Sequence, residues 1–284
     1  MNRIQNITIE YAGKGFNVSK GLANLGYQTI ATGFIHSSDI DEAYGSLLNV
    51  TPDPIICPGS ARINTKIYDI SKGITTELNE PGKTVDSKTI TQLTQKIQTL
   101  SARSSVLIFS GSIPPGCKDD IYKELIQISK RNCRFIVLDS SSNPLKLGIE
   151  SLPNMIKPNK EELELLIGKK LNSLNEIKDA ALDLVHHGIE IVCVTLGSEG
   201  AICVTMEECL FAPAVSNINV KCTVCAGDSF IAGFCVGVVN NLSKKECFKM
   251  AVAAATAAVV QSGSAVVTKE LMNEFLNRVE IRNI

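Results

Sequence analysis

The sequence has no tryptophan, only three histidines, and aromatic residues at only 5 % of its 284 positions. So few aromatic rings disfavour a surface on which nucleic-acid bases stack. Neither sign of charge is in surplus, because 28 Lys and Arg residues stand against 29 Asp and Glu residues. Since affinity for a phosphate backbone needs a basic surplus, the composition argues against a nucleic acid as partner.

Long hydrophobic runs are also absent. The longest apolar stretch covers residues 250–260, contains Thr256 and is too short to span a bilayer. Polar residues interrupt the first ten positions, so we expect no signal peptide. The ten cysteines lack the dense pattern of a short secreted protein. We therefore expect a cytoplasmic protein with reduced thiols and no membrane partner.

Apolar residues make up 44 % of the chain, which suffices for a substantial core. Short β-rich runs alternate with helical patterns. This alternation predicts an α/β three-layer sandwich, in which helices cover both faces of a mostly parallel sheet. Binding sites in such folds lie beyond the carboxyl ends of the strands. The expected strands cover residues 28–35, 105–110, 134–138, 155–157, 191–195 and 201–205, and the expected helices cover 16–25, 86–101, 118–130, 160–167, 174–187, 226–240, 243–262 and 269–279.

Residues 61–79 break this alternation and predict a β-hairpin. Its first strand carries Arg62, Asn64 and Lys66 on one face, because side chains two apart in a strand share a face. A small sheet with one basic, polar face is typical of a lid over an anionic ligand. The same pattern also fits an ordinary solvated surface.

A glycine-containing turn precedes the first expected helix. Gly13 would let the backbone approach a ligand at the helix start, where an anion is favoured. Lys14 would add a point charge for a phosphate, and Asn17 could bond a hydroxyl group. The turn is no dinucleotide-binding fingerprint, because Val18 occupies the third glycine position. Taken alone, a plain turn before a helix explains the same residues.

The segment from Thr223 to Asp228 is the strongest local signal, because it leads into an apolar helix with many small residues. The backbone N–H groups of Ala226 and Gly227 would point outward at the helix start and stabilise charge on a transferred phosphoryl group. Asp228 could accept a proton from an attacking hydroxyl group. The alternative is that Asp228 only complements the helix dipole.

Three further segments have both a functional and a structural interpretation. Asn159 and Glu162 could organise a hydrated magnesium ion, although the same spacing fits a helix cap. Residues 195–200 could lie along a nucleotide or form only a turn between strands. Residues 110–116 suit a substrate-binding loop or a plain change of chain direction.

The chain carries, in this order, the motifs AGKGFNV, RINTK, TELNEPG, SGSIPPG, LDSS, KPNKEELE, VTLGSEGA and TVCAGDSF. Together they resemble the motifs of the PfkB (ribokinase-like) carbohydrate kinases, and within them the group of 1-phosphofructokinases and tagatose-6-phosphate kinases. The resemblance covers nearly the whole chain. It implies the ribokinase-like fold with a core of residues 11–60 and 81–284 and a small β-sheet lid of residues 1–10 and 61–80. It also implies a homodimer formed through the lid.

The resemblance implies ATP-dependent phosphorylation of a ketohexose phosphate, with Asp228 as general base and the backbone of residues 225–228, with Cys225 at its start, as anion hole. AGKG and LDSS favour fructose 1-phosphate, which would become fructose 1,6-bisphosphate. A tagatose-6-phosphate or fructose-6-phosphate kinase is the alternative. The residues expected on the sugar-phosphate side are Gly13, Lys14, Asn17, Arg62, Asn64, Lys66 and Ser112. Those expected to bind ATP are Lys157, Asn159, Thr195, Gly197, Gly200, Ala255 and Thr256, and those expected to hold Mg²⁺ through water are Asn159 and Glu162.

The sequence departs from the family pattern at two places. Cys225 stands where the family usually has glycine, and we expect the helix start to favour its thiolate form. With Cys222 it forms a lone Cys-x-x-Cys pair, for which a zinc or redox site would need further ligands. Relatives also have a first strand and an N-P-A-x-D-like segment before the position that matches Met1. A chain without them would expose a sheet edge, so a non-catalytic binder of nucleotide or sugar phosphate is a further hypothesis.

Overall fold

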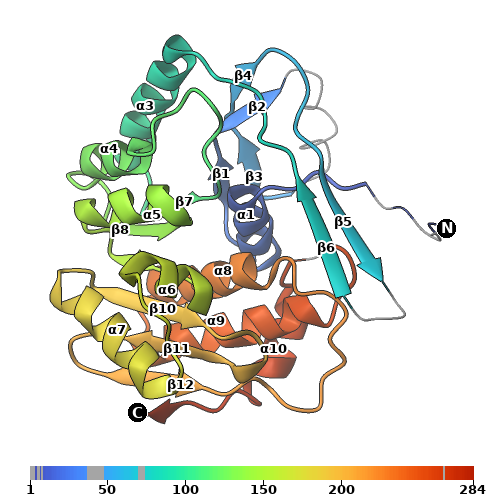
Figure 1. Ribbon diagram of the computed structural model, residues 1–284, viewed down its shortest axis with the longest axis vertical. Coiled ribbons are helices and arrows are strands. Elements are labelled where there is room, and N and C mark those ends of the chain that lie inside the picture. Colours follow the sequence, from blue (N-terminus) through green and yellow to red (C-terminus); the bar gives the residue numbers. More distant parts are fainter. Residues whose placement is uncertain (1–3, 5–6, 8, 37–47, 70–73, 265) are drawn as a thin grey trace.

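A seven-stranded sheet runs through the computed structural model, which describes residues 4, 7, 9–36, 48–69, 74–264 and 266–284 (Figure 1). β7 to β10 pair in parallel, and the remaining pairings are antiparallel. The strands lie in the order β13 (Arg282–Asn283), β12 (Cys209–Ala212), β11 (Ala201–Val204), β10 (Ile191–Thr195), β9 (Met155–Ile156), β8 (Phe135–Asp139) and β7 (Val106–Ser110).

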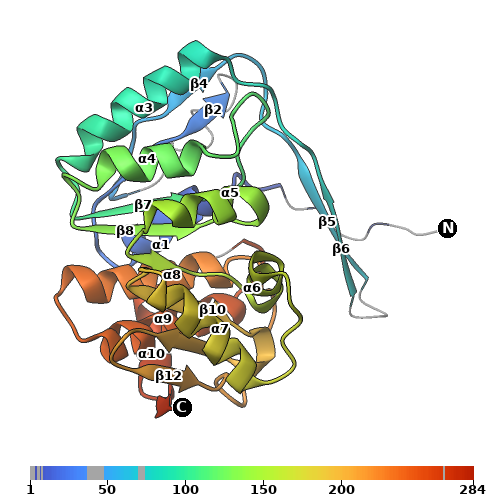
Figure 2. The same ribbon diagram turned by 60° about the vertical axis from the view of Figure 1, so that its left-hand side comes forward.

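The central strands are apolar on both faces because helices cover the sheet from both sides. In β8, Val137 packs into one buried cluster, whereas Ile136 and Leu138 pack into the other. One helical layer contains α1 (Lys14–Asn24), α8 (Ala226–Val239), α9 (Lys244–Val259) and α10 (Lys269–Leu276). The opposite layer contains α3 (Ser87–Ser101), α4 (Ile121–Ser129), α5 (Ser142–Gly148), α6 (Lys160–Ile167) and α7 (Leu174–His186) (Figure 2). The predicted three-layer α/β architecture is therefore confirmed.

Three two-stranded sheets complete the described strands. β1 (Thr29–Ala31) pairs in parallel with β3 (Val50–Pro52), and β2 (Phe34–His36) pairs in parallel with β4 (Ile55–Cys57). β5 (Asn64–Asp69) and β6 (Ile74–Asn79) form the expected antiparallel hairpin, which extends away from the core (Figures 1 and 2). The described residues among 1–10 belong to no strand, so their assignment to the lid stays a prediction.

Local signals in the sequence explain several element boundaries. The predicted strand 28–35 divides into β1 and β2 at Gly33, whose φ of 142° favours glycine. Ser243 and Glu246 form a reciprocal capping box at the start of α9. Ser173 caps α7 through the Glu176 N–H, but the Glu176 carboxylate accepts from the Asn172 N–H instead. Within the described residues, no helix combines the length and the hydrophobicity that a membrane crossing requires.

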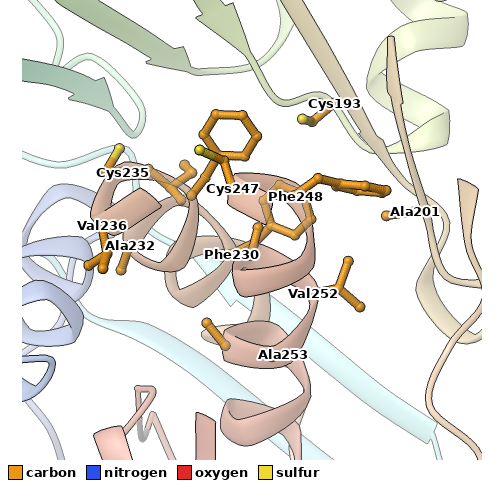
Figure 3. Close-up of a cluster of buried hydrophobic side chains, with 14 of the residues drawn as sticks. Cys193, Ala201, Phe230, Ala232, Cys235, Val236, Cys247, Phe248, Val252 and Ala253 are labelled. Atoms are coloured by element: carbon orange, nitrogen blue, oxygen red, sulfur yellow. The ribbon is translucent and has the colours of Figure 1, made fainter. Parts of the chain in front are cut away.

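Two glycines let α8 and α9 pack closely in the core that Figure 3 shows. A Cβ atom on Gly233 would lie 2.6 Å from the Met250 carbonyl oxygen, and one on Gly237 would lie 2.6 Å from Cys247 Sγ. Near the start of α8, the rings of Phe230 and Phe248 meet edge to face with centroids 6.1 Å apart. The position of the α8 N-terminus is therefore fixed by a dry, tightly packed helix pair.

We expect Gly233→Ala to destabilise the fold by about 1–3 kcal/mol, because the new methyl group forces α8 and α9 apart. Glycine to alanine inside a helix otherwise stabilises by about 1 kcal/mol, so the sign of the change is diagnostic. Urea denaturation measures the free energy of unfolding. The control is Gly15→Ala in α1, whose Cβ would meet only the Ser110 carbonyl oxygen, at 3.8 Å. Equal stability of both variants would contradict this account of the helix packing.

Candidate active site

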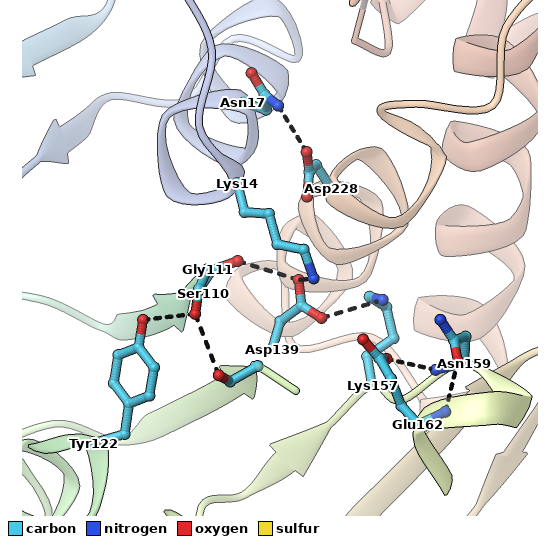
Figure 4. A network of polar contacts seen from close by, with 11 residues as sticks. Lys14, Asn17, Ser110, Gly111, Tyr122, Asp139, Lys157, Asn159, Glu162 and Asp228 are labelled. Carbon is cyan, nitrogen blue, oxygen red and sulfur yellow. Dashed lines mark hydrogen bonds and ion pairs between the residues drawn. The ribbon is translucent and has the colours of Figure 1, made fainter. Parts of the chain in front are cut away.

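The candidate site lies at the carboxyl edge of the sheet, where the starts of α1 and α8 face each other (Figure 4). Ser110 ends β7 and Asp139 ends β8, and the parallel register places the two residues opposite each other. Residues from the starts of α1 and α8 and from the loop after β9 converge on this edge. This is the location that the topology predicts for a ligand.

Asp228 is buried in the first turn of α8 and is held by Asn17 of α1. The Asn17 side-chain amide donates to Asp228 Oδ2 over 2.8 Å. Burial raises the pKa of Asp228 to about 6, and the nearby charge of Asp139 adds to the rise. Asn17, Lys14 and Lys157 act in the opposite direction. A carboxylate that titrates close to neutral pH is well suited to accept a proton from a hydroxyl group.

Asn17 also has a buried side-chain carbonyl oxygen that can accept a hydrogen bond. Within the described part of the chain, its Oδ1 atom has no hydrogen-bond partner. A buried, unpaired carbonyl oxygen is unfavourable unless a ligand supplies a donor. Asn17 can therefore hold Asp228 through its nitrogen and accept from a ligand hydroxyl through its oxygen.

Asp139 lies in the candidate site, although the sequence motifs did not single it out. Its side chain is 1 % exposed and lies 3.4 Å from Lys14 Nζ and 3.3 Å from Lys157 Nζ. Burial alone would raise the pKa of Asp139, but Lys157, Lys14 and the Ser110 hydroxyl hold it below its ordinary value. The available signal was the motif LDSS, in which a charged residue directly follows an apolar strand.

Lys157 is buried between Asp139 and the start of α8. Burial alone would lower its pKa, whereas Asp139, Glu162 and Asp228 raise it above its ordinary value, so the ammonium group stays charged. A Cβ atom on Gly227 would lie 3.1 Å from Lys157 Nζ. A side chain at position 227 would crowd Lys157, which passes over the first turn of α8, and this crowding favours glycine there.

The segment expected to form an anion hole is the start of a helix, with one difference from the expectation. The Ala226 N–H, expected to point outward, donates instead to the Thr223 carbonyl over 3.3 Å in the turn that leads into α8. The backbone of Gly227 and Asp228 remains at the helix terminus, where the dipole favours an anion. Lys157 adds a full positive charge at the same place.

The expectation that Cys225 is a thiolate is wrong. Its thiol is buried at the N-cap of α8 and donates to the Ser264 carbonyl over 3.2 Å. Burial raises the pKa of Cys225 to about 12, and the charge of Asp228 adds to the rise. Desolvation and a neighbouring carboxylate thus outweigh the helix dipole, and this cysteine is protonated at neutral pH.

Asn159 and Glu162 form a full capping box at the start of α6. Asn159 Oδ1 accepts from the Glu162 N–H over 2.8 Å, and Glu162 Oε2 accepts from the Asn159 N–H over 2.9 Å. The structural interpretation of this motif is therefore confirmed. The side-chain oxygens of both residues are also suitable partners for the water shell of Mg²⁺, which keeps several of its waters. Among the described residues, no three His, Cys, Asp or Glu side chains could hold a metal directly.

Two of the three segments expected to bind the nucleotide lie side by side, because Asn159 and Thr195 form a β-bridge. Gly197 opens the 3-10 turn η2 (Gly197–Glu199), and a Cβ atom there would meet nothing within 4 Å. Position 200 requires a glycine for a structural reason, because a Cβ atom there would lie 2.0 Å from the Ala212 carbonyl oxygen. On α9, Ala255 is half-buried, and the buried Thr256 hydroxyl donates to the Val252 carbonyl of its own helix.

Arg62, expected on the first strand of the hairpin, instead precedes β5, which begins at Asn64, and it donates to Ser112 Oγ over 2.8 Å. These two residues, both expected on the sugar-phosphate side, are therefore brought together. Lys66 instead pairs across the hairpin with Glu77, over 2.8 Å, and Asn64 is exposed on the same face. Gly13 leaves open space at the start of α1, since a Cβ atom there would meet nothing within 4 Å.

The chain is similar to carbohydrate kinases in sequence and in fold. The family model described as pfkB family carbohydrate kinase matches residues 1–270. The 1-phosphofructokinase of Haemophilus influenzae is 32 % identical over 289 residues, which cover 100 % of this chain and 91 % of that protein. The crystal structure of phosphofructokinase-2 from Escherichia coli in complex with potassium has 25 % identity and a TM-score of 0.86, and the match covers 94 % of this chain and 87 % of that one. The tetrameric inhibited form of that enzyme has 24 % identity and a TM-score of 0.86, covering 97 % and 90 % of the two chains.

The chain belongs to the pfkB family of carbohydrate kinases, and it is therefore a sugar kinase. The family, the fold and the class of enzyme that the motifs predicted are confirmed. Membership implies the use of ATP, and Mg²⁺ is typical of the family.

We expect Asp228→Asn to stabilise the protein at neutral pH. The folded protein keeps a proton on Asp228 up to about pH 6, whereas the ordinary pKa is 3.8. Since the unfolded chain loses this proton first, the free energy of unfolding falls as pH rises from about 4 to about 6. The variant has no carboxylate at this position, so its free energy of unfolding should not fall in this way. Above pH 6 it should exceed that of the wild type by up to about 3 kcal/mol, and below about pH 4 the two values should not differ on this account.

Urea denaturation of both proteins across this pH range measures the difference. Asp183→Asn replaces an exposed aspartate of α7 and serves as the control. A stability difference that does not change with pH would show that Asp228 titrates at its ordinary value in the folded protein.

Proposed function

We propose that the protein transfers the γ-phosphoryl group of ATP to the C6 hydroxyl group of fructose 1-phosphate, with Asp228 as general base. The observation that carries this proposal is the buried Asp228 carboxylate at the start of α8, which Asn17 holds and which lies within the charge influence of Lys14 and Lys157. The sugar is inferred from the 1-phosphofructokinase of Haemophilus influenzae, which matches the whole length of this chain.

In the proposed step, Asp228 takes the proton from the C6 hydroxyl group as its oxygen forms a bond to the γ-phosphorus. The bond between that phosphorus and the oxygen of the departing ADP breaks. Negative charge spreads over the transferred group, and the α8 N-terminus and Lys157 lie where they would stabilise it. Most of the catalysis is then positioning and electrostatics, because phosphoryl transfer needs little covalent chemistry from the protein.

The existing phosphate of the sugar has its own proposed partners. Lys14 and Arg62 would hold it, with Ser112 beside Arg62 and Asn17 bonding a sugar hydroxyl group. Residues 61–80 would act as the lid that brings Arg62 to the ligand. Holding the phosphate at one end fixes the distance from the other end of the sugar to Asp228.

The nucleotide would lie along Thr195 and Gly197, with its phosphates towards Lys157. Asn159 and Glu162 would hold Mg²⁺ through water, and the ion would neutralise phosphate charge when bound. Both side chains are already fixed by the capping box of α6, so the water-binding oxygens are pre-positioned. The cytoplasmic location expected from the sequence stays a prediction.

A fructose-6-phosphate or tagatose-6-phosphate kinase is the second candidate. The likeness to phosphofructokinase-2 from Escherichia coli favours the first of these, because a structure of that enzyme holds fructose-6-phosphate. We expect kcat/KM for fructose 1-phosphate to exceed that for either 6-phosphate by more than about tenfold. Coupled assays of ADP release with the three sugar phosphates measure this ratio.

Asp228→Asn tests the chemistry in the same assay. We expect kcat to fall by about 10²–10⁴-fold, while the Kd for ATP stays nearly unchanged. A wild-type chain that binds ATP but turns over none of the three sugar phosphates would favour the non-catalytic binder. Turnover that survives the substitution would remove Asp228 from the mechanism.

A homodimer through the hairpin is also part of the proposal. Ile67 and Leu78 lie on one face of the hairpin and are 52 % and 56 % exposed, and Ile63, directly before β5, is 68 % exposed. Apolar side chains gathered on one exposed face are typical of a surface that another chain covers. A second copy of the chain fits this role, and the related phosphofructokinase-2 forms a tetramer in its inhibited state.

We expect Ile67→Lys combined with Leu78→Lys to yield a monomer, because two charges on this face oppose its burial. Asn79→Lys places the same charge on the opposite face of the hairpin and should leave the dimer intact. Sedimentation velocity gives the mass of each variant. Dimers of equal strength in all three proteins would exclude the hairpin as the interface.

A further inference from the structure

One carboxylate connects the two phosphate-binding ends of the candidate site. Asp139 Oδ2 lies 3.4 Å from Nζ of Lys14, on α1, and Asp139 Oδ1 lies 3.3 Å from Nζ of Lys157, in the loop before α6. In the proposed function, Lys14 serves the sugar phosphate and Lys157 serves the nucleotide. The two lysines come from segments far apart in the sequence, and Asp139 contacts both of them.

Asp139 is itself held firmly in place. The Ser110 hydroxyl donates to its Oδ2 atom over 3.1 Å, and the Gly111 N–H donates to its backbone carbonyl over 3.0 Å. Both contacts come from the end of β7, which pairs with β8 up to this residue. The carboxylate is therefore fixed by the sheet and not by the flexible side chains that it contacts.

The contacts to the lysines leave room for a ligand. Hydrogen bonds between charged groups are usually about 2.7–2.9 Å long, shorter than either Asp139–lysine distance. An ammonium group has three donors, of which one carboxylate oxygen occupies at most one. Lys14 is also 42 % exposed. Asp139 thus orients the ammonium groups without consuming their capacity to bind phosphate oxygens.

We propose that Asp139 is a positioning residue, whose carboxylate holds Lys14 and Lys157 so that both substrate phosphates are aligned with Asp228. This inference rests on the proposed function. It explains why a fully buried carboxylate lies at this edge although it touches neither the transferred group nor the attacking hydroxyl in the proposed step.

Asp139→Asn removes the charge and keeps the shape. We expect kcat to fall at least about 100-fold, because small errors in alignment cost about that much. Ser110→Ala removes one hydrogen bond but keeps the carboxylate, and we expect kcat to fall by less than about fivefold. Circular dichroism and thermal unfolding show whether both variants are folded.

The pH profile separates positioning from a merely structural role. Asp228 faces Asn17 and Lys14 from α1, Asp139 from β8, and Lys157 from the loop before α6, while Cys225 precedes it on α8. Loss of the negative charge at Asp139 leaves the two lysines to favour the ionised form of Asp228. The acid limb of kcat/KM should therefore move to lower pH in Asp139→Asn and stay near about pH 6 in Ser110→Ala.

Asp139→Asn leaves Lys157 buried and unpaired, so this variant can fail to fold. A second pair of variants tests the inference in that case. Lys157→Met and the double variant Lys157→Met with Asp139→Asn differ only at Asp139, and neither leaves that lysine unpaired. Calorimetric titration with fructose 1-phosphate should give a Kd at least about tenfold weaker for the double variant, because Lys14 loses its partner. Equal Kd values would overturn the inference.

The possible results distinguish the proposed function from the role of Asp139. An inactive wild-type protein would overturn the proposed function. An active wild type together with a folded Asp139→Asn variant of unchanged kcat and pH profile would overturn only the role of Asp139.

Discussion

The pairing of two buried charges constrains the rest of this molecule. Asp139 and Lys157 are both withdrawn from water, and each is stabilised there by the charge of the other. Their contact requires the end of β8 and the loop after β9 to meet, which the parallel register of these strands provides. A buried ion pair contributes little net stability compared with apolar side chains. We infer that this pair is retained for the position of its charges.

The apolar interior sets the chemistry of Asp228. Burial is the largest cause of its raised pKa, and Asp228 belongs to the first turn of α8, whose packing against α9 depends on Gly233 and Gly237. The tight helix pair therefore fixes the position in which the carboxylate is buried. The same burial makes the ionised site unfavourable at neutral pH, so basicity at Asp228 is obtained at the expense of stability.

Residues with strong periodic or motif signals were predictable from the sequence. Asp228, Asn17 and Lys14 follow from motifs that place polar groups at helix starts, and the main strands follow from apolar runs. Asp139 was missed because one carboxylate after a strand has no local pattern, and its partners are fixed only by the fold. The short β3, β4, β12 and β13 were missed because so few residues carry little periodic signal, and pairing with neighbouring strands defines them. The thiolate at Cys225 was wrongly expected because a sequence shows the helix start but not the burial.

Structural and functional interpretations of one motif do not exclude each other at this edge of the sheet. Asn159 and Glu162 cap α6, and the cap fixes the side chains that are proposed to face the hydrated ion. A ligand that meets side chains already held by hydrogen bonds loses less conformational entropy on binding. Asn17 combines the roles in the same way, since its nitrogen holds Asp228 while its buried oxygen has no partner among the described residues. The structural bonds of these residues are thus a reason to expect them in the site, because they hold polar atoms in place before a substrate arrives.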